Sequence, residues 1–219
     1  MSEYVNTYDL NNPYQVIPMQ RDEFYDEQIE VYKKTGAPTK AVDIIDVIIF
    51  NESGELIIQK RADHKKHNAN LLDKSIWWHI QNGDNPNHTV MVETVQELEI
   101  PSLVVNNHTE FMRTYNVLNS YLQSMSLIQY IDTKIYTIEK IFGKEKIIIA
   151  NRIHFYLWVY WGRTKNVDRE AKGILLYSLE SLEKEIKEYP NTFTDDLKLL
   201  IEKYRPEIVS FLQILKKDK

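Results

Sequence analysis

Residues 76–100, IWWHIQNGDNPNHTVMVETVQELEI, place two adjacent tryptophans before a Gly-Asp turn and a helical segment. Pro86 suits the first turn of a helix, where its missing N–H is not needed, and Asn85 before it is a favourable N-cap. On this helix Glu93 and Glu97 are four residues apart, so they share one face. The stretch therefore predicts a turn and a helix that carries two carboxylates beside two large aromatic side chains.

A hairpin and a polar loop come before this stretch. In residues 41–62, AVDIIDVIIFNESGELIIQKRA, two apolar runs flank a turn in which Gly54 can supply a positive φ. Residues 63–75 are polar and predict a loop. Nearer the N-terminus, residues 4–19 predict two strands around an Asn-Asn-Pro turn, and residues 21–38 predict a helix that ends at its Gly and Pro.

The second half of the chain mixes both periodicities. The strand patterns lie in residues 135–150, with a hairpin turn at Gly143-Lys144, and in residues 152–161 and 173–179. The helical patterns lie in residues 109–125, 180–190 and 194–215, the last with Thr194 as N-cap. Because strands and helices are interleaved, the chain is expected to form one compact α/β or α+β unit.

Composition narrows the function classes. The 219 residues carry a net charge of -5 with no basic block, which disfavours nucleic acid as a partner. The chain has no cysteine, which excludes disulfides, zinc-thiolate sites and cysteine nucleophiles. No apolar run approaches the roughly 20 residues that a membrane helix needs, and the N-terminal segment lacks the apolar core of a signal peptide. A cytoplasmic protein without a membrane partner is expected.

The order of hairpin, polar loop, Gly-acid turn and glutamate-bearing helix resembles the Nudix superfamily. The signature of that family is G-x5-E-x7-R-E-U-x-E-E-x-G-U, where U is aliphatic. In the best register Glu93, Glu97 and Ile100 match strictly, while Asp84 and Gln96 stand in for glutamates. Trp78 replaces the first glycine of the signature. Val92 replaces the arginine, Thr94 an aliphatic residue and Glu99 the late glycine.

The resemblance covers most of the chain and is closest to the branch near isopentenyl-diphosphate isomerases. It implies an α/β/α sandwich with a mixed sheet, divided into an N-terminal arm (1–38), the hairpin, loop and box helix (39–101), a helical insert (102–148) and a closing part (149–219). Isomerase activity is not expected, because Trp77 stands where that branch has its catalytic cysteine. His79 matches the metal-binding histidine of the branch.

The resemblance also implies a metal site. Nudix enzymes cleave a diphosphate with Mg²⁺ or Mn²⁺ and an attacking water, and such hard cations prefer carboxylate oxygens. The implied metal ligands are Glu93, Glu97 and Asp84, and the implied catalytic residues are Glu93, Glu97 and Gln96. Gln96 keeps an oxygen that can ligate a cation but cannot act as a base. Replacing the arginine by Val92 removes support of the metal ligands, a change that typically weakens a metal site by about 10–100-fold.

The substrate-binding candidates are Arg61, Lys66, His79, Trp77 and Trp78. Arg61 suits a bidentate phosphate contact. A solvated loop is the simpler explanation of Lys66, and His79 is a metal ligand or a core residue. The two tryptophans form a core or interface, a stacking platform for a nucleobase or isoprenoid-like tail, or a plug in the diphosphate site. If the strand with Trp158 and Trp161 borders the box, both tryptophan pairs could form one cluster.

Two functions remain open after these steps. The first is a divergent Nudix hydrolase that cleaves a small-molecule diphosphate, such as a nucleoside diphosphate derivative, with Mg²⁺. The second is a catalytically inactive Nudix-fold protein that binds a ligand or another protein, since a fold does not imply an activity. A homodimer is usual for the superfamily and is implied here too.

Overall fold

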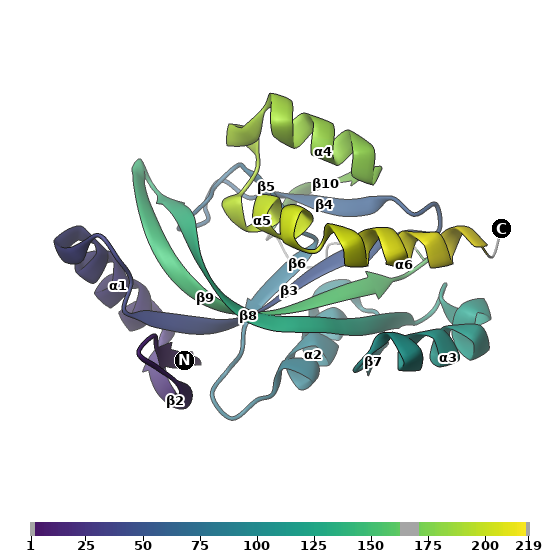
Figure 1. The fold of residues 1–219 in the computed structure, drawn as a ribbon, viewed down its shortest axis with the longest axis horizontal. Helices are drawn as coiled ribbons and strands as arrows, with labels where there is room; N and C mark the ends of the chain where they lie inside the picture. The colour runs from purple at the N-terminus through teal and green to yellow at the C-terminus, as the bar shows by residue number, and fades with distance from the viewer. Residues whose placement is uncertain (1–2, 163–170, 218–219) are drawn as a thin grey trace.

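The computed structural model describes residues 3–162 and 171–217, without the side chains of residues 97–98, 171 and 216–217. Figure 1 shows one curled sheet with helices on both faces. The strands are β1 (Tyr4–Asp9), β2 (Asn12–Gln20), β3 (Lys40–Phe50), β4 (Leu56–Arg61), β5 (Leu72–Asp73), β6 (Ile76–His79), β7 (Ser102–Val105), β8 (Ser126–Phe142), β9 (Glu145–Val159) and β10 (Ala171–Tyr177). The helices are α1 (Arg21–Thr35), α2 (Pro86–Leu98), α3 (His108–Leu118), α4 (Leu179–Glu188), α5 (Asp195–Lys203) and α6 (Arg205–Lys217), with short 3₁₀ turns at Asn119–Tyr121 and Pro190–Thr192.

The centre of the sheet is the strand trio β3, β9 and β8, within the order β10-β4-β3-β9-β8-β7. β3 and β9 run parallel from the Ala41/Ala150 pair to the Phe50/Val159 pair, whereas β8 and β9 form a long antiparallel hairpin. Parallel central strands are buried on both faces and therefore read as continuous apolar runs. Residues 41–50 and 153–160 follow that pattern and are buried throughout.

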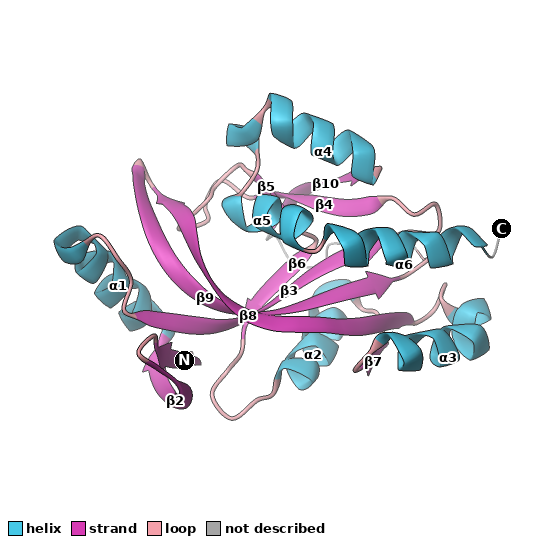
Figure 2. Ribbon diagram, viewed as in Figure 1, coloured by secondary structure: helices cyan, strands magenta, loops and turns pink. Residues whose placement is uncertain are grey.

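Two apolar clusters cover the two faces of the sheet. The larger contains residues of α1, α3, α4, α5 and α6, together with Ile44, Ile48 and Phe50 of β3. The smaller contains Val90 of α2 with the alternate β3 residues. Figure 2 shows the helices α5 and α6 running across the strands while α2 lies apart from them. The expected α/β/α sandwich with a mixed sheet is therefore confirmed, and it is consistent with a Nudix-type fold.

The predicted helix starts are confirmed at the level of single hydrogen bonds. The Asn85 side chain accepts from the backbone N–H of His88, and the Thr194 side chain accepts from that of Leu197. Gly36 ends α1 with φ 77°, a left-handed conformation that suits glycine. Each cap satisfies a backbone group that the first or last turn of a helix leaves unpaired.

The alternation predicted for residues 152–161 is also confirmed. Phe155, Leu157, Val159 and Trp161 pack with the larger cluster, and Tyr156, Trp158 and Tyr160 pack with the smaller one. The four tryptophans nevertheless do not form one cluster. Trp78 joins Trp158, whereas Trp77 lies at a pocket described below and Trp161 contacts Tyr115. Successive residues of a strand point to opposite faces, so residues an odd number of positions apart, such as Trp77 and Trp78 or Trp158 and Trp161, are separated.

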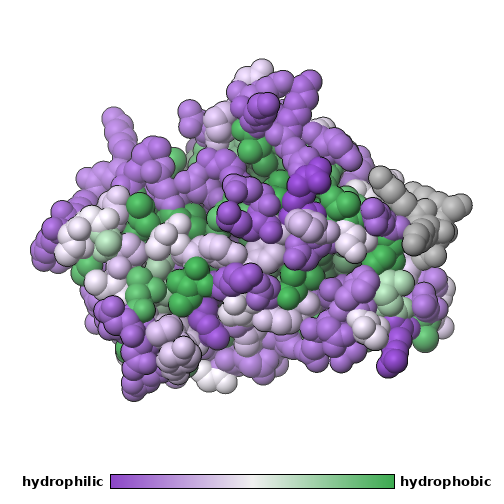
Figure 3. All heavy atoms as spheres, viewed as in Figure 1, coloured by the Kyte–Doolittle hydropathy of each residue, from purple (hydrophilic) through white to green (hydrophobic). Residues whose placement is uncertain are grey.

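Residues 102–148 are only partly helical, in contrast to the helical insert that was expected. Helix α3 lies where the spacing predicted one, but residues 126–142 form β8 and pair with β9 along their whole length. This segment is thus part of the central sheet. None of the helices among the described residues is long and apolar enough to cross a membrane. The face seen in Figure 3 is mostly hydrophilic, with apolar residues in small groups.

Candidate functional site

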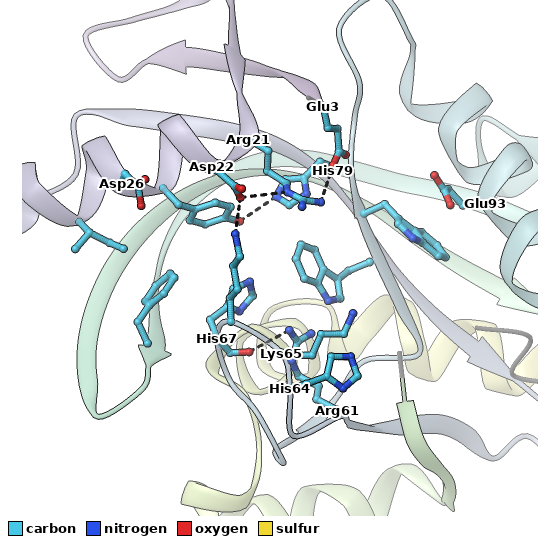
Figure 4. Close-up of a pocket in the computed structure, with 16 residues that line it drawn as sticks. Glu3, Arg21, Asp22, Asp26, Arg61, His64, Lys65, His67, His79 and Glu93 are labelled. Atoms are coloured by element: carbon cyan, nitrogen blue, oxygen red, sulfur yellow. Dashed lines mark hydrogen bonds and ion pairs between the residues drawn. The ribbon is translucent and has the colours of Figure 1, made fainter. Parts of the chain in front are cut away.

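A pocket of about 350 Å³ opens between α1, the loop that follows β4, strand β6 and helix α2. Figure 4 shows its lining, with Arg61, His64 and Lys65 gathered on the loop side and Glu93 at the opposite side. Such concave sites, with an apolar wall and a few convergent polar groups, are where small ligands bind. This pocket is therefore the candidate functional site.

Strand β6 decides which way the two adjacent tryptophans point. It pairs antiparallel with β3, with Trp77 opposite Asp46 and Trp78 opposite Ile45. Trp78 therefore packs towards the smaller cluster under α2, while Trp77 lies on the other face. Both tryptophans are half-buried and line the pocket, but only Trp78 also packs against an apolar cluster.

Five aromatic rings form one continuous wall of the pocket, called here the aromatic wall. Its members are Tyr25, His67, Trp77, His79 and Phe142, and neighbouring ring centroids lie 5.2–6.0 Å apart. Tyr25 comes from the N-terminal arm and its hydroxyl lies 2.9 Å from Nε2 of His79. The arm therefore contributes directly to the pocket.

Both histidines of the aromatic wall are neutral at neutral pH. Burial holds the pKa of His67 well below its usual value, and the ammonium of Lys140 lowers it further. The pKa of His79 is depressed by the same two causes, with Arg21 as a third. A neutral imidazole can accept as well as donate a hydrogen bond, so the wall combines flat apolar faces with two polar edges.

Three cationic groups surround the indole of Trp77. The guanidinium carbon of Arg61 lies 5.4 Å from the ring centroid, Nζ of Lys74 lies 5.7 Å from it and Nζ of Lys140 lies 5.2 Å from it. Each distance is within the range of a cation–π contact. The indole thus forms the boundary between the pocket and a buried, charged interior.

Lys74 is the centre of that interior. Its Nζ is fully buried and lies 2.9 Å from Asp196 Oδ2 and 3.1 Å from Asp46 Oδ1, with Asp73 at 3.7 Å. Burial raises the pKa of Asp46 to about 8, although the nearby Lys74 ammonium opposes the shift. The attraction of these carboxylates outweighs burial and raises the pKa of Lys74 above its usual value. Asp73 also binds Arg61, at 3.1 Å.

The structure brings together most of the residues that the sequence singled out. Those that line the pocket are Arg61, Lys66, His79, Trp77, Trp78 and Glu93. Asp84 is instead exposed in the turn before α2, 3.4 Å from His88, and Gln96 is exposed on α2; neither lines this pocket. The side chain of Glu97 lies outside the described part of the chain.

Four carboxylates, those of Glu3, Asp22, Asp26 and Glu93, line this pocket. Mg²⁺ or Mn²⁺ is bound through carboxylates and substrate oxygens. In the described part of the chain, Glu93 is the one carboxylate of the expected set that lines the pocket. In the described part of the chain, no three His, Asp or Glu side chains are grouped so that they could hold a metal. Among the described side chains, Glu93 is therefore the expected ligand that a bound cation would meet at this pocket.

The sequence reasoning missed Tyr25, Phe142 and Lys140. One signal was available for Lys140, because it alternates with Ile138 and Phe142 in a predicted strand and so shares their face. His67 lies in the polar loop that the sequence predicts for residues 63–75. Two hydrogen bonds to Ile141 of β8 position this loop, one donated by the Asn68 N–H and one accepted by its side-chain oxygen.

A second polar cluster joins the N-terminal arm to the sheet away from this pocket. Asp43 Oδ1 lies 2.7 Å from Nε2 of His154, and Oδ2 accepts from the Tyr8 hydroxyl at 3.1 Å. Arg152 donates to Tyr8 and lies 3.3 Å from Asp43. Because Nδ1 of His154 also lies 2.7 Å from the Thr133 hydroxyl, both ring nitrogens of this buried histidine have a partner.

No protein-family model and no curated protein matches the chain. Among solved structures it is similar to DR0079 from Deinococcus radiodurans, with a TM-score of 0.59 and 13% identity over 91% of this chain and 98% of that one. Two weaker likenesses are a bifunctional NMN adenylyltransferase/ADP ribose pyrophosphatase from Francisella tularensis (TM-score 0.47, 15% identity, 85% of this chain and 46% of that one) and a MutT protein from Methanosarcina mazei Go1 (TM-score 0.46, 15% identity, 76% and 94%). The first shows a shared fold alone, and the other two carry no argument about this chain.

Proposed function

We propose that this protein binds a small molecule that carries a phosphate or diphosphate group next to a planar ring. The observation that carries the proposal is the joining of the aromatic wall to a basic group on the loop after β4. Arg61, Lys65 and Lys66 of this loop line the same pocket as Trp77. Lysine and arginine favour phosphate oxygens, and a flat ring stacks on aromatic side chains.

The acidic residues of the pocket are consistent with an exchange of partners when the ligand binds. Lys66 Nζ lies 2.8 Å from Asp22, and both side chains are largely exposed. Exposed ion pairs contribute only about 0–1 kcal/mol. A ligand phosphate can therefore replace Asp22 as the partner of Lys66 at little cost in free energy.

The second candidate is a Mg²⁺-dependent hydrolase of the same ligand class. It is favoured by the position of Glu93, which reaches the pocket from α2, one turn before Glu97 on the same helix. Asp84 and Gln96 complete the expected set in the sequence but do not line the pocket. The ligand-binding function is put first because Arg61, Lys65 and Lys66 place phosphate-binding groups at the pocket whether or not a metal binds.

A panel of nucleoside diphosphates and their sugar derivatives tests both candidates. Binding is measured by calorimetry with and without Mg²⁺ or Mn²⁺, and product release is measured on the same samples. Metal-independent binding without turnover supports a ligand-binding protein. Metal-dependent turnover that disappears in Glu93→Gln and Glu97→Gln supports the hydrolase. If both variants keep the rate of the wild type, the turnover comes from a contaminant. Absence of binding to every member of the panel contradicts the proposal.

A further inference from the structure

Lys140 is a fully buried lysine that forms no close ion pair among the described residues, although its charge helps to lower the pKa of Asp196 from a longer distance. Its Nζ has no hydrogen-bond partner in the part of the chain that the structure describes, and its contacts are with the rings of Trp77 and Tyr25, at 5.2 and 5.8 Å. Burying a charge is unfavourable unless it is paired and hydrogen-bonded. Lys74, equally buried, has three carboxylates within 3.7 Å. Among the described residues, no carboxylate is hydrogen-bonded to Nζ of Lys140.

Two more polar atoms face the same indole without a partner. These are Nε of Arg61 and Nδ1 of His67, both buried and without a hydrogen bond among the described residues. The guanidinium carbon of Arg61 lies 5.4 Å from the Trp77 ring centroid, and the centroid of the His67 ring lies 5.5 Å from it. Buried polar groups are usually satisfied, and groups of exceptions need a reason. Here three exceptions surround one side chain.

We propose that the Trp77 indole occupies an anion site, and that a phosphate group of the ligand takes its place between Lys140, Arg61 and His67. This inference rests on the proposed function, since it assigns the phosphate of that ligand to a particular position. An anion would give Lys140 a charged partner and would add a second one for Arg61, which already pairs with Asp73. It would accept hydrogen bonds from all three residues when His67 carries its proton on Nδ1. The indole offers them only its π face.

The indole of Trp77 has room to rotate into the adjacent pocket. Trp77 is only half-buried and borders the open pocket of about 350 Å³, and β6 is a strand of four residues. Rotation of the side chain into the pocket uncovers Lys140, and the displaced indole then lies beside the ligand's planar part. A phosphate group is smaller than an indole, so the vacated volume accommodates it.

The test measures the binding of inorganic pyrophosphate by calorimetry, because this probe has no ring and reports on the anion site alone. Trp77→Ala is expected to bind pyrophosphate about 10- to 100-fold more tightly than the wild type, the range expected for charge-assisted hydrogen bonds. Adding Lys140→Met to Trp77→Ala should remove that gain. Trp161→Phe, at a tryptophan distant from the cationic groups, is expected to bind as the wild type does.

The possible outcomes separate this inference from the proposed function. A folded Trp77→Ala protein with unchanged or weaker pyrophosphate binding overturns the inference, as does a gain that survives Lys140→Met. If Trp77→Ala does not fold, Trp77→Phe is measured instead and must show a smaller gain of the same kind, and no gain overturns the inference. Wild-type binding of nucleoside diphosphates without any gain refutes the inference alone. A gain in a protein whose wild type binds no nucleoside diphosphate supports the inference and refutes the proposed function.

Discussion

The hydroxyl of Tyr25 and Nε2 of His79 lie 2.9 Å apart and are both buried. Tyr25 belongs to the helix of the N-terminal arm, and His79 ends the strand that carries both tryptophans. This hydrogen bond connects two segments that are 54 residues apart in sequence. The arm is therefore a structural part of the pocket.

Tyr25→Phe should destabilise the protein by about 1–3 kcal/mol, because it leaves a nitrogen of His79 buried without its partner. Urea unfolding followed by circular dichroism measures the change in the free energy of unfolding. Tyr14→Phe is the matched control, since the Tyr14 side chain in β2 is 93% exposed. Equal stabilities of the two variants would show that the hydrogen bond contributes nothing.

The two fully buried lysines should respond in opposite ways to the same substitution. Lys74→Met leaves Asp46, Asp73 and Asp196 buried without their shared cation and should lower the free energy of unfolding by about 3–5 kcal/mol. Lys140→Met removes a buried charge that forms no close ion pair among the described residues and acts on Asp196 only from a longer distance, so stability should stay within about 1 kcal/mol or rise. Thermal and urea unfolding of both variants give the comparison. A similar loss in both would mean that Lys140 has a stabilising partner.

Asp46→Asn should change how stability depends on pH. Burial raises the pKa of Asp46 to about 8, so between about pH 4 and 8 the folded protein keeps a proton that the unfolded chain releases. The unfolded state then binds fewer protons, and stability falls as the pH rises through this range, by up to about 1.4 kcal/mol per unit. The amide cannot ionise, so the variant should gain stability over the wild type from pH 4 towards pH 8.

Melting temperatures across this pH range measure the effect. Glu52→Gln, at an exposed acid in the turn between β3 and β4, controls for the loss of one negative charge. Parallel curves for the wild type and Asp46→Asn would contradict a raised pKa for Asp46.

Lys66→Ala should weaken binding of a nucleoside diphosphate by about 3- to 10-fold and reduce its dependence on salt, because an exposed charge is screened by ions. Lys134→Ala is the control, since this exposed lysine also pairs with one aspartate but lies on β8 and does not line the pocket. Titrations at two salt concentrations give both quantities. The same loss in both variants would indicate a general charge effect.

Much of the pocket's composition could be read from short-range sequence patterns. Asn85 and Pro86 placed the start of α2, and alternation placed Trp158 on one face of its strand and Trp161 on the other. Arg61, Lys66 and Trp77 were predicted from the sequence as substrate-binding residues, and all three line the pocket. Such patterns work because a cap, a turn or a strand period depends on residues within one element.

Tertiary structure alone decided which of these residues meet. The sequence by itself determined the α/β class, the caps and the side-chain alternation, since these depend on local backbone geometry. It could not show that Tyr25 reaches His79, or that Lys140 lies buried beside Trp77, because contacts between distant segments depend on how strands pair and helices pack. The register that sets Trp77 opposite Asp46 turns one tryptophan of the pair towards buried cations and leaves the other in the apolar core.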